Sequence, residues 1–217
     1  NCNDLSVIDG VSGTVKYDPT TKTLTLENAT IDTGDDTGDN AQGIFNSEVP
    51  DLNIQVNGTN KITSHSSAVT ISQTTTISGT GTLNATSTDN CGIYVFYSAL
   101  TIEDCTVSAI GKWGIAGPGY NNRAEFVIRN AIVTAKGSDG SICDISKFTL
   151  NNVAITSPTG AAYDSSLKCV ALNGKVVTDI VAILPLTYGI KIAGTDVTPN
   201  NCNDLSVIDG VSGTVKY

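Results

Sequence analysis

An eight-residue pattern that returns along the chain constrains the fold more than any other feature. It reads apolar, Thr or Val, apolar, any residue, Asn or Asp, two free positions, then Ile or Val. Looser versions cover residues 52–62 and 75–83. The full matches are residues 24–31 (LTLENATI), 100–107 (LTIEDCTV), 126–133 (FVIRNAIV) and 148–155 (FTLNNVAI). Repetition of a short strand-like segment at a variable spacing is typical of a coiled β-solenoid.

The third residue of each match serves as an anchor for one coil. Most anchors are separated by about 20 to 26 residues, which suits stacked coils with one tight bend and one variable loop. A shorter apolar segment follows most matches, so each coil should carry two or three short strands. We therefore predict an all-β protein, a single-stranded right-handed parallel β-helix with irregular coils. The expected anchors are Leu26, Val56, Ile77, Ile102, Ile128, Leu150 and Leu172.

The Asn or Asp of the pattern is expected to form a tight corner of each coil. Asn and Asp tolerate the left-handed backbone conformation that a short corner requires, and an amide can bond to its equivalent one coil away. The predicted structural ladder consists of Asn28, Asp104, Asn130 and Asn152.

An N-terminal β-hairpin is expected over residues 13–26. Val15 and Tyr17 alternate with polar residues, residues 18–21 (DPTT) supply the turn, and Leu24 and Leu26 alternate again.

Residues 1–17 recur letter for letter at 201–217. A copy of this length indicates either a tandem array cut slightly past a unit boundary or an artificial duplication, and we favour the array. We assign residues 1–185 to one β-solenoid unit, with the hairpin at 13–26 and coils over 23–185, and residues 186–217 to the start of a next unit. Because the second copy lacks its hairpin partner, it is expected to mediate head-to-tail or swapped self-association, to cap an edge or to be poorly ordered.

The composition excludes several classes of function. Charged residues make up only 15% of the chain and the formal net charge is −9, so a nucleic-acid-binding surface is not expected. No apolar run is long enough to cross a membrane, so membrane insertion is not expected.

The six cysteines have no C-x-x-C spacing, which argues against zinc-ribbon and thioredoxin-like motifs. Free thiols are favoured over three disulfides, and Cys105 is expected to be a small buried apolar residue.

Two surface sites are candidates for ligand binding. Calcium would use the acidic loop residues Asp32, Asp35, Asp36 and Asp39, because flexible acidic loops supply the oxygen ligands that calcium prefers, although a solvated loop is the alternative. Aromatic residues amount to 6% of the chain, yet several gather in two consecutive coils and could stack on sugar rings, or could instead shield the core. The predicted glycan-binding residues are Trp113, Tyr94, Phe96, Tyr120, Asn121 and Arg123.

No catalytic residues are assigned. The only histidine, His65, lies in a polar loop without a triad motif. The acids on the predicted strands, Glu27, Glu103 and Asp104, occupy repeat positions and resemble solvated corners rather than a catalytic carboxylate pair.

Residues 188–200 (YGIKIAGTDVTPN), followed by the 13–31 segment, resemble the module head of secreted, often tandem, proteins of gut bacteria. Residues 52–63 and 79–86 are similar to the right-handed β-helix family associated with carbohydrate binding. The resemblance implies an extracellular or cell-surface location and a cell-surface or dietary polysaccharide as partner. It favours a non-catalytic module for adhesion or glycan binding. A polysaccharide lyase or glycoside hydrolase on the same fold and a structural stalk unit are the alternatives.

Overall fold

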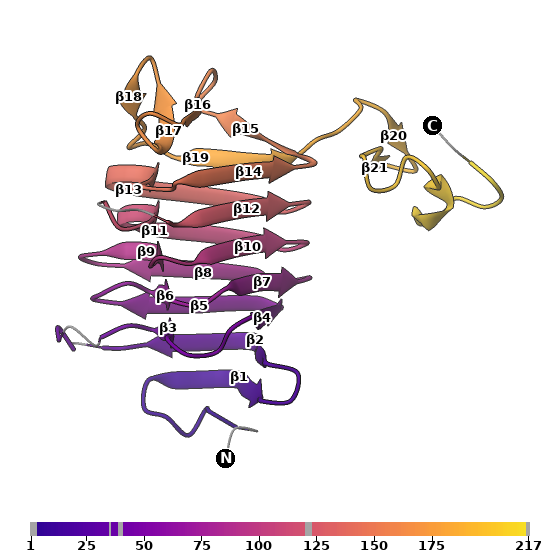
Figure 1. The fold of residues 1–217 in the computed structure, drawn as a ribbon. Coiled ribbons are helices and arrows are strands. Elements are labelled where there is room, and N and C mark those ends of the chain that lie inside the picture. The colour runs from indigo at the N-terminus through magenta and orange to yellow at the C-terminus, as the bar shows by residue number, and fades with distance from the viewer. Residues whose placement is uncertain (1–3, 35, 39–40, 120–122, 216–217) are drawn as a thin grey trace.

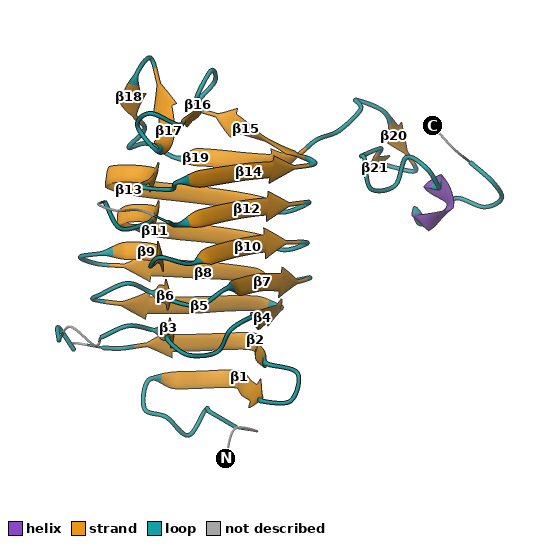
Figure 2. Cartoon of the chain, viewed as in Figure 1, coloured by secondary structure: helices purple, strands orange, loops and turns teal. Residues whose placement is uncertain are grey.

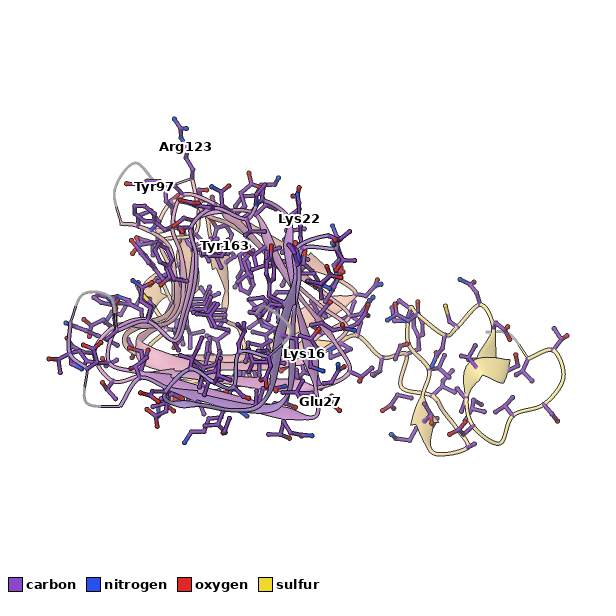
Figure 3. The ribbon with its side chains drawn as sticks, turned by 90° about the horizontal axis from the view of Figure 1, so that it is seen from below. Lys16, Lys22, Glu27, Tyr97, Arg123 and Tyr163 are labelled. Carbon is purple, nitrogen blue, oxygen red and sulfur yellow. The ribbon has the colours of Figure 1, made fainter. Side chains whose placement is uncertain are left out.

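Strands from successive coils stack in parallel to form a right-handed parallel β-helix (Figure 1). The structure is a computed structural model that describes residues 4–34, 36–38, 41–119 and 123–215. The strands belong to three faces, and side chains fill the space that the faces enclose (Figure 3). The predicted fold class is confirmed.

The first face carries the repeating pattern. Its strands pair in parallel, and β2 bends to continue into the second face. In stacking order the first face contains β2 (Thr23–Asp32), β4 (Leu52–Asn57), β7 (Thr75–Gly79), β10 (Ala99–Glu103), β12 (Glu125–Arg129) and β14 (Lys147–Asn151).

The second and third faces share two long strands that bend at glycine-containing corners. The second face contains the end of β2, β5 (Thr59–Ser64), β8 (Thr82–Ser87) and the first parts of β11 (Thr106–Ala116) and β13 (Ile132–Cys143). The third face contains β3 (Ile44–Asn46), β6 (Val69–Ile71), β9 (Cys91–Val95) and the last parts of β11 and β13.

Like residues form columns inside the helix, but two predicted anchors are out of register. Ile77, Ile102 and Ile128 are aligned and fully buried, as predicted. In the first two coils Leu24 and Ile54 occupy this column, whereas Leu26 and Val56 align with Gly79. The predicted anchors Leu26 and Val56 therefore lie two residues beyond this column. Because side chains alternate with a period of two, both still point into the core and are fully buried.

Left-handed residues mark the corner between the first and second faces. Asn28, Asp104, Asn130 and Asn152 have φ values between 48° and 58°. Their side chains do not form one continuous ladder among the described residues: Asn152 Nδ2 donates to Asn130 Oδ1 at 3.0 Å, whereas Asn28 Oδ1 accepts from the backbone N–H of Thr59 at 3.1 Å. In the second and third coils Gly58 and Gly79 supply the positive φ.

A substitution at Asn130 tests this corner. Valine at this position should lower the free energy of unfolding by about 1–2 kcal/mol, because a β-branched residue is disfavoured at positive φ, whereas Asn130→Gly should change it by a few tenths. Urea denaturation followed by circular dichroism measures both. Equal losses for the two variants would show that the corner needs the amide and not the backbone conformation.

The N-terminal end is covered by the predicted hairpin. Strand β1 (Val11–Asp18) pairs antiparallel with β2, with Val15 opposite Leu26 and Tyr17 opposite Leu24. This hairpin closes the edge of the stack at which the parallel ladder begins (Figure 1).

The C-terminal end is capped by strands that the repeating pattern did not predict. Strand β19 (Val181–Pro185) inserts antiparallel between β13 and β15 (Val153–Ser157), so one reversed strand lies between the last two strands of the second face. The prediction that Leu172 anchors a further coil is wrong. Leu172 lies in a separate antiparallel sheet of β16 (Ala162–Asp164), β17 (Cys169–Leu172) and β18 (Lys175–Val176).

The chain after β19 forms a small lobe beside the stack (Figure 2). It holds the two-stranded sheet of β20 (Lys191–Ile192) and β21 (Thr195–Asp196) and the 3₁₀ helix η1 (Leu205–Val207). Val197, Leu205 and Ile208 form its buried cluster. Within the described ranges, no helix has the length and apolar character of a membrane span.

Candidate functional site

A surface cavity on the third face brings together two of the predicted aromatic residues. Tyr94 of β9 and Trp113 of β11 line a cavity of about 340 Å³. The rest of its lining comes from Asn90, Cys91, Ala116, the loop of residues 117–119 and Asp144. Both aromatic side chains are partly exposed.

The β ladder of the third face positions these residues. Ile93 and Ile115 are paired in register and point into the core, so Tyr94, the neighbour of Ile93, lies on the outer side. Trp113 pairs with Cys91 directly after the register shift that follows Gly111. The backbone N–H groups of Lys112 and Trp113 both donate to the carbonyl oxygen of Asn90, at 2.8 and 3.3 Å. The backbone bonds therefore fix the position of the indole relative to Tyr94.

The floor of the cavity is apolar and uncharged. Cys91 and Ala116 belong to a small outer cluster that also contains Cys143, Cys169 and Ala171, against which Tyr94 and Trp113 pack. Burial raises the pKa of Cys91 to about 12 and also raises the pKa values of Cys143 and Cys169. These thiols are therefore protonated at neutral pH and behave as small apolar groups.

Polar groups lie at the rim. The ammonium group of Lys112 lies 5.2 Å from the centroid of the Trp113 ring, a cation–π contact. Partial burial raises the pKa of Asp144, and the charge of Lys168 opposes this shift. The carboxyl group of Asp144 faces the backbone of Gly119, at which an added β carbon would lie 3.7 Å from Oδ2. The site thus combines an aromatic wall with hydrogen-bonding groups at its edge.

The other predicted glycan-binding residues are less closely associated with the cavity. The ring of Phe96 lies 5.7 Å from that of Tyr94, and its side chain is exposed, but it does not line the cavity. Arg123 extends outward from the ribbon (Figure 3). Tyr120 and Asn121 lie outside the described residues.

The acidic loop shows local turns at the two acids that the structure describes. Asp32 Oδ1 accepts from the backbone N–H of Gly34 at 2.9 Å, and Asp36 Oδ1 accepts from that of Gly38 at 2.8 Å. Asp35 and Asp39 lie outside the described residues. No group of three or more potential metal ligands occurs among residues 4–34, 36–38, 41–119 and 123–215. Calcium binding by this loop stays a prediction.

Two acids on the strands of the first face, Glu103 and Glu125, form surface ion pairs. Glu103 Oε2 lies 3.5 Å from Arg129 across the β10–β12 pair, and Glu125 Oε2 lies 3.1 Å from Lys147 across the β12–β14 pair. These pairs join adjacent coils and give no support to the enzyme alternative. His65 Nδ1 lies 3.2 Å from Thr88 Oγ1, and its Nε2 lies 4.0 Å from Asp89.

Free thiols, favoured from the sequence, are found at the cysteines that the structure describes, and Cys2 lies outside the described residues. Among the described cysteines, Cys91, Cys105, Cys143, Cys169 and Cys202 are free. Cys105 is buried in the main core, as expected for a small apolar residue at the corner.

Sequence reasoning missed several residues of the cavity. Cys91, Ala116 and Asp144 come from three different coils, and only the stacking of β9, β11 and β13 brings them together. It also missed Asn60, a fully buried residue whose Oδ1 accepts from the backbone N–H of Ala29 at 2.9 Å. The sequence signal for Asn60 is its place three residues after Asn57, to whose carbonyl oxygen it donates at 3.0 Å.

The fold and the site define this protein as a right-handed parallel β-helix with an aromatic cavity on its third face. No family model matches the sequence, and no match was found among curated proteins or solved structures.

Proposed function

We propose that this protein is a non-catalytic carbohydrate-binding module that uses the cavity between Tyr94 and Trp113. The observation that carries the proposal is the placement of these two partly exposed rings beside the apolar residues Cys91 and Ala116, with Asp144 in the same lining and Lys112 against the Trp113 ring. A sugar ring has an apolar face that packs on aromatic rings and hydroxyl groups that need hydrogen-bond partners at its rim.

The size and charge of the cavity favour a short stretch of a neutral or weakly charged glycan. The volume of about 340 Å³ lies at the lower end of the range for small-molecule sites. The protonated thiol of Cys91 contributes no charge to the lining, Asp144 contributes a carboxyl group, and Lys112 supplies a cation beside the Trp113 ring. The family resemblance suggests a cell-surface or dietary polysaccharide as the source, and a protein that acts outside the cell or at its surface.

Replacing Trp113 with alanine should weaken glycan binding at least tenfold, which corresponds to about 1.4 kcal/mol, because the variant loses the main stacking surface. The wild-type protein is first screened on an array of neutral and acidic oligosaccharides. Disaccharides that contain the recognised linkage are then titrated against the wild type, Trp113→Ala and Tyr94→Ala by calorimetry.

The single tryptophan of the chain provides an independent readout. A ligand in the cavity should change the emission of Trp113, and the change should saturate at the affinity that calorimetry gives. Phe45→Ala is the matched control, because Phe45 is an exposed aromatic residue of the same face, two coils away from Tyr94. Full affinity in Trp113→Ala, or no hit on the array, would contradict the proposal.

A further inference from the structure

The cavity between Tyr94 and Trp113 has a negative charge in its lining. Asp144 is the only charged residue among the described residues that line it. Both carboxyl oxygens of Asp144 face the loop of residues 117–119, because a β carbon added at Gly119 would lie 3.7 Å from Oδ2 and 3.8 Å from Oδ1. That loop belongs to the same lining. The carboxyl group therefore borders the space that a ligand would occupy.

The thiols next to the cavity respond to the same negative charge. Burial is the main cause of the raised pKa values of Cys91, Cys143 and Cys169, and the charge of Asp144 raises all three further. The charge of Asp139 adds to the shift at Cys143. A negative charge raises the pKa of a thiol because it opposes formation of the thiolate. The electrostatic potential on the inner side of the cavity is therefore negative.

The cavity also destabilises the ionised form of Asp144. Partial burial raises the pKa of this carboxyl group, and the opposing charge of Lys168 does not cancel the effect. Lys168 is not one of the residues that line the cavity. A cation bound in the cavity would therefore stabilise a carboxylate that burial destabilises.

The two aromatic rings favour the same kind of ligand. The face of an aromatic ring carries a negative partial charge and attracts cations, and aromatic cages are a recurrent way of binding organic ammonium groups. Trp113 already attracts one cation, the ammonium group of Lys112, at 5.2 Å from the ring centroid. Lys112 is exposed and does not line the cavity, so solvent screens its charge from a ligand there. Two rings and one carboxylate thus act together on a positively charged ligand.

We propose that the glycan bound by this cavity carries an ammonium group, either on an amino sugar without an N-acetyl group or as a choline substituent. The inference rests on the proposed function, because it names the class of glycan. The ammonium group pairs with the carboxylate of Asp144, while the apolar part of the ligand packs on Trp113 and Tyr94. A neutral sugar keeps only the stacking contacts, and Asp144 repels an acidic sugar.

Titrations of the full chain, followed by the emission of Trp113, compare ligands that differ in charge. The glucosamine disaccharide is paired with its N-acetylated form, and choline is paired with its uncharged isostere dimethylbutanol. The wild type should bind at least one ammonium probe at least tenfold more tightly than its neutral counterpart. Asp144→Asn should reduce this preference to less than twofold and leave the affinity for the neutral probes unchanged. Asparagine tolerates the left-handed conformation of residue 144, where φ is 52°, so the corner is kept.

Asp139→Asn is the matched control, because Asp139 is an exposed acid of the same strand that does not line the cavity. It removes the same charge and should retain the full preference. Far-ultraviolet circular dichroism establishes that both variants remain folded. An equal loss of preference in the two variants would overturn the proposal in favour of nonspecific attraction to an acidic chain.

The two pairs of probes also separate this proposal from the proposed function. Equal binding of the charged and neutral member of each pair would overturn the ammonium specificity and leave carbohydrate binding intact. Binding of choline that depends on Asp144, without a response to either sugar, would support ammonium recognition and contradict stacking of a sugar ring in the cavity. No response to either ammonium probe would overturn the proposal.

Discussion

Replacing Phe126 with alanine is expected to lower the free energy of unfolding by about 3–5 kcal/mol. Phe126 is the largest fully buried side chain of the described residues, and it lies in β12 between Leu100 of β10 and Phe148 of β14. Its ring centroid lies 5.4 Å from that of Phe148 in a stacked arrangement. Removing the ring takes apolar contacts from two neighbouring coils at once.

The loss of stability should lie near the top of the usual range for Phe→Ala substitutions, because the neighbouring coils are held at a fixed spacing. Backbone hydrogen bonds to β10 and β14 hold β12 on both sides, so the surrounding coils cannot close in to fill the cavity. Chemical denaturation monitored by circular dichroism and by Trp113 emission measures the effect. Phe45→Ala, at a side chain that is 54% exposed, should change the stability by about 0.5 kcal/mol or less. A loss below about 1.5 kcal/mol in Phe126→Ala would show that the core can repack.

Alanine at Gly114 is expected to destabilise the corner between the second and third faces by about 3 kcal/mol. An added β carbon would lie 2.4 Å from the carbonyl oxygen of Ser141, 2.8 Å from the nitrogen of Lys136 and 3.1 Å from the β carbon of Ala135. The two closest atoms belong to the backbone of β13, which cannot move without breaking its ladder with β11. The steric clash would therefore strain the backbones of both β11 and β13.

Gly119→Ala is the matched comparison for this substitution. Its β carbon would meet only the carboxyl group of Asp144, at ordinary contact distances of 3.7 to 3.9 Å, and Gly119 has no positive φ. We expect a change of about 0.5 kcal/mol or less from this variant. Thermal unfolding of the two proteins side by side measures the difference. Equal stability of the two would mean that the coils separate easily at this corner.

The cavity residues show what sequence reasoning can and cannot find. Alternation along residues 92–95 was enough to predict that Tyr94 lies outside, because Ile93 and Val95 are the natural core residues of that strand. That Trp113 lines the same cavity depends on the register shift after Gly111. The contribution of Asp144 depends on the bend of β13 at residues 137–140, which no local pattern specifies.

At the ends of the β-helix, too, one feature follows from local sequence signals and another is decided only by the tertiary structure. The hairpin at the N-terminal end follows from alternation and a DPTT turn, both of which are local signals. The C-terminal cap required β19 to reverse direction and insert between β13 and β15. Residues 181–185 form an apolar segment that could pair in either direction. The direction of pairing is therefore decided only by the free edge of β13 that the segment meets.

The sequence by itself determined the architecture, because each coil repeats the same apolar spacing and left-handed corners fall at Asn28, Asp104, Asn130 and Asn152. These are local properties of the individual coils, with Gly58 and Gly79 in place of Asn or Asp at two corners. The tertiary structure decided the register of Leu24 and Ile54, the antiparallel cap and the cavity beside Trp113. Each of these depends on which strand edge or apolar surface a segment meets in space.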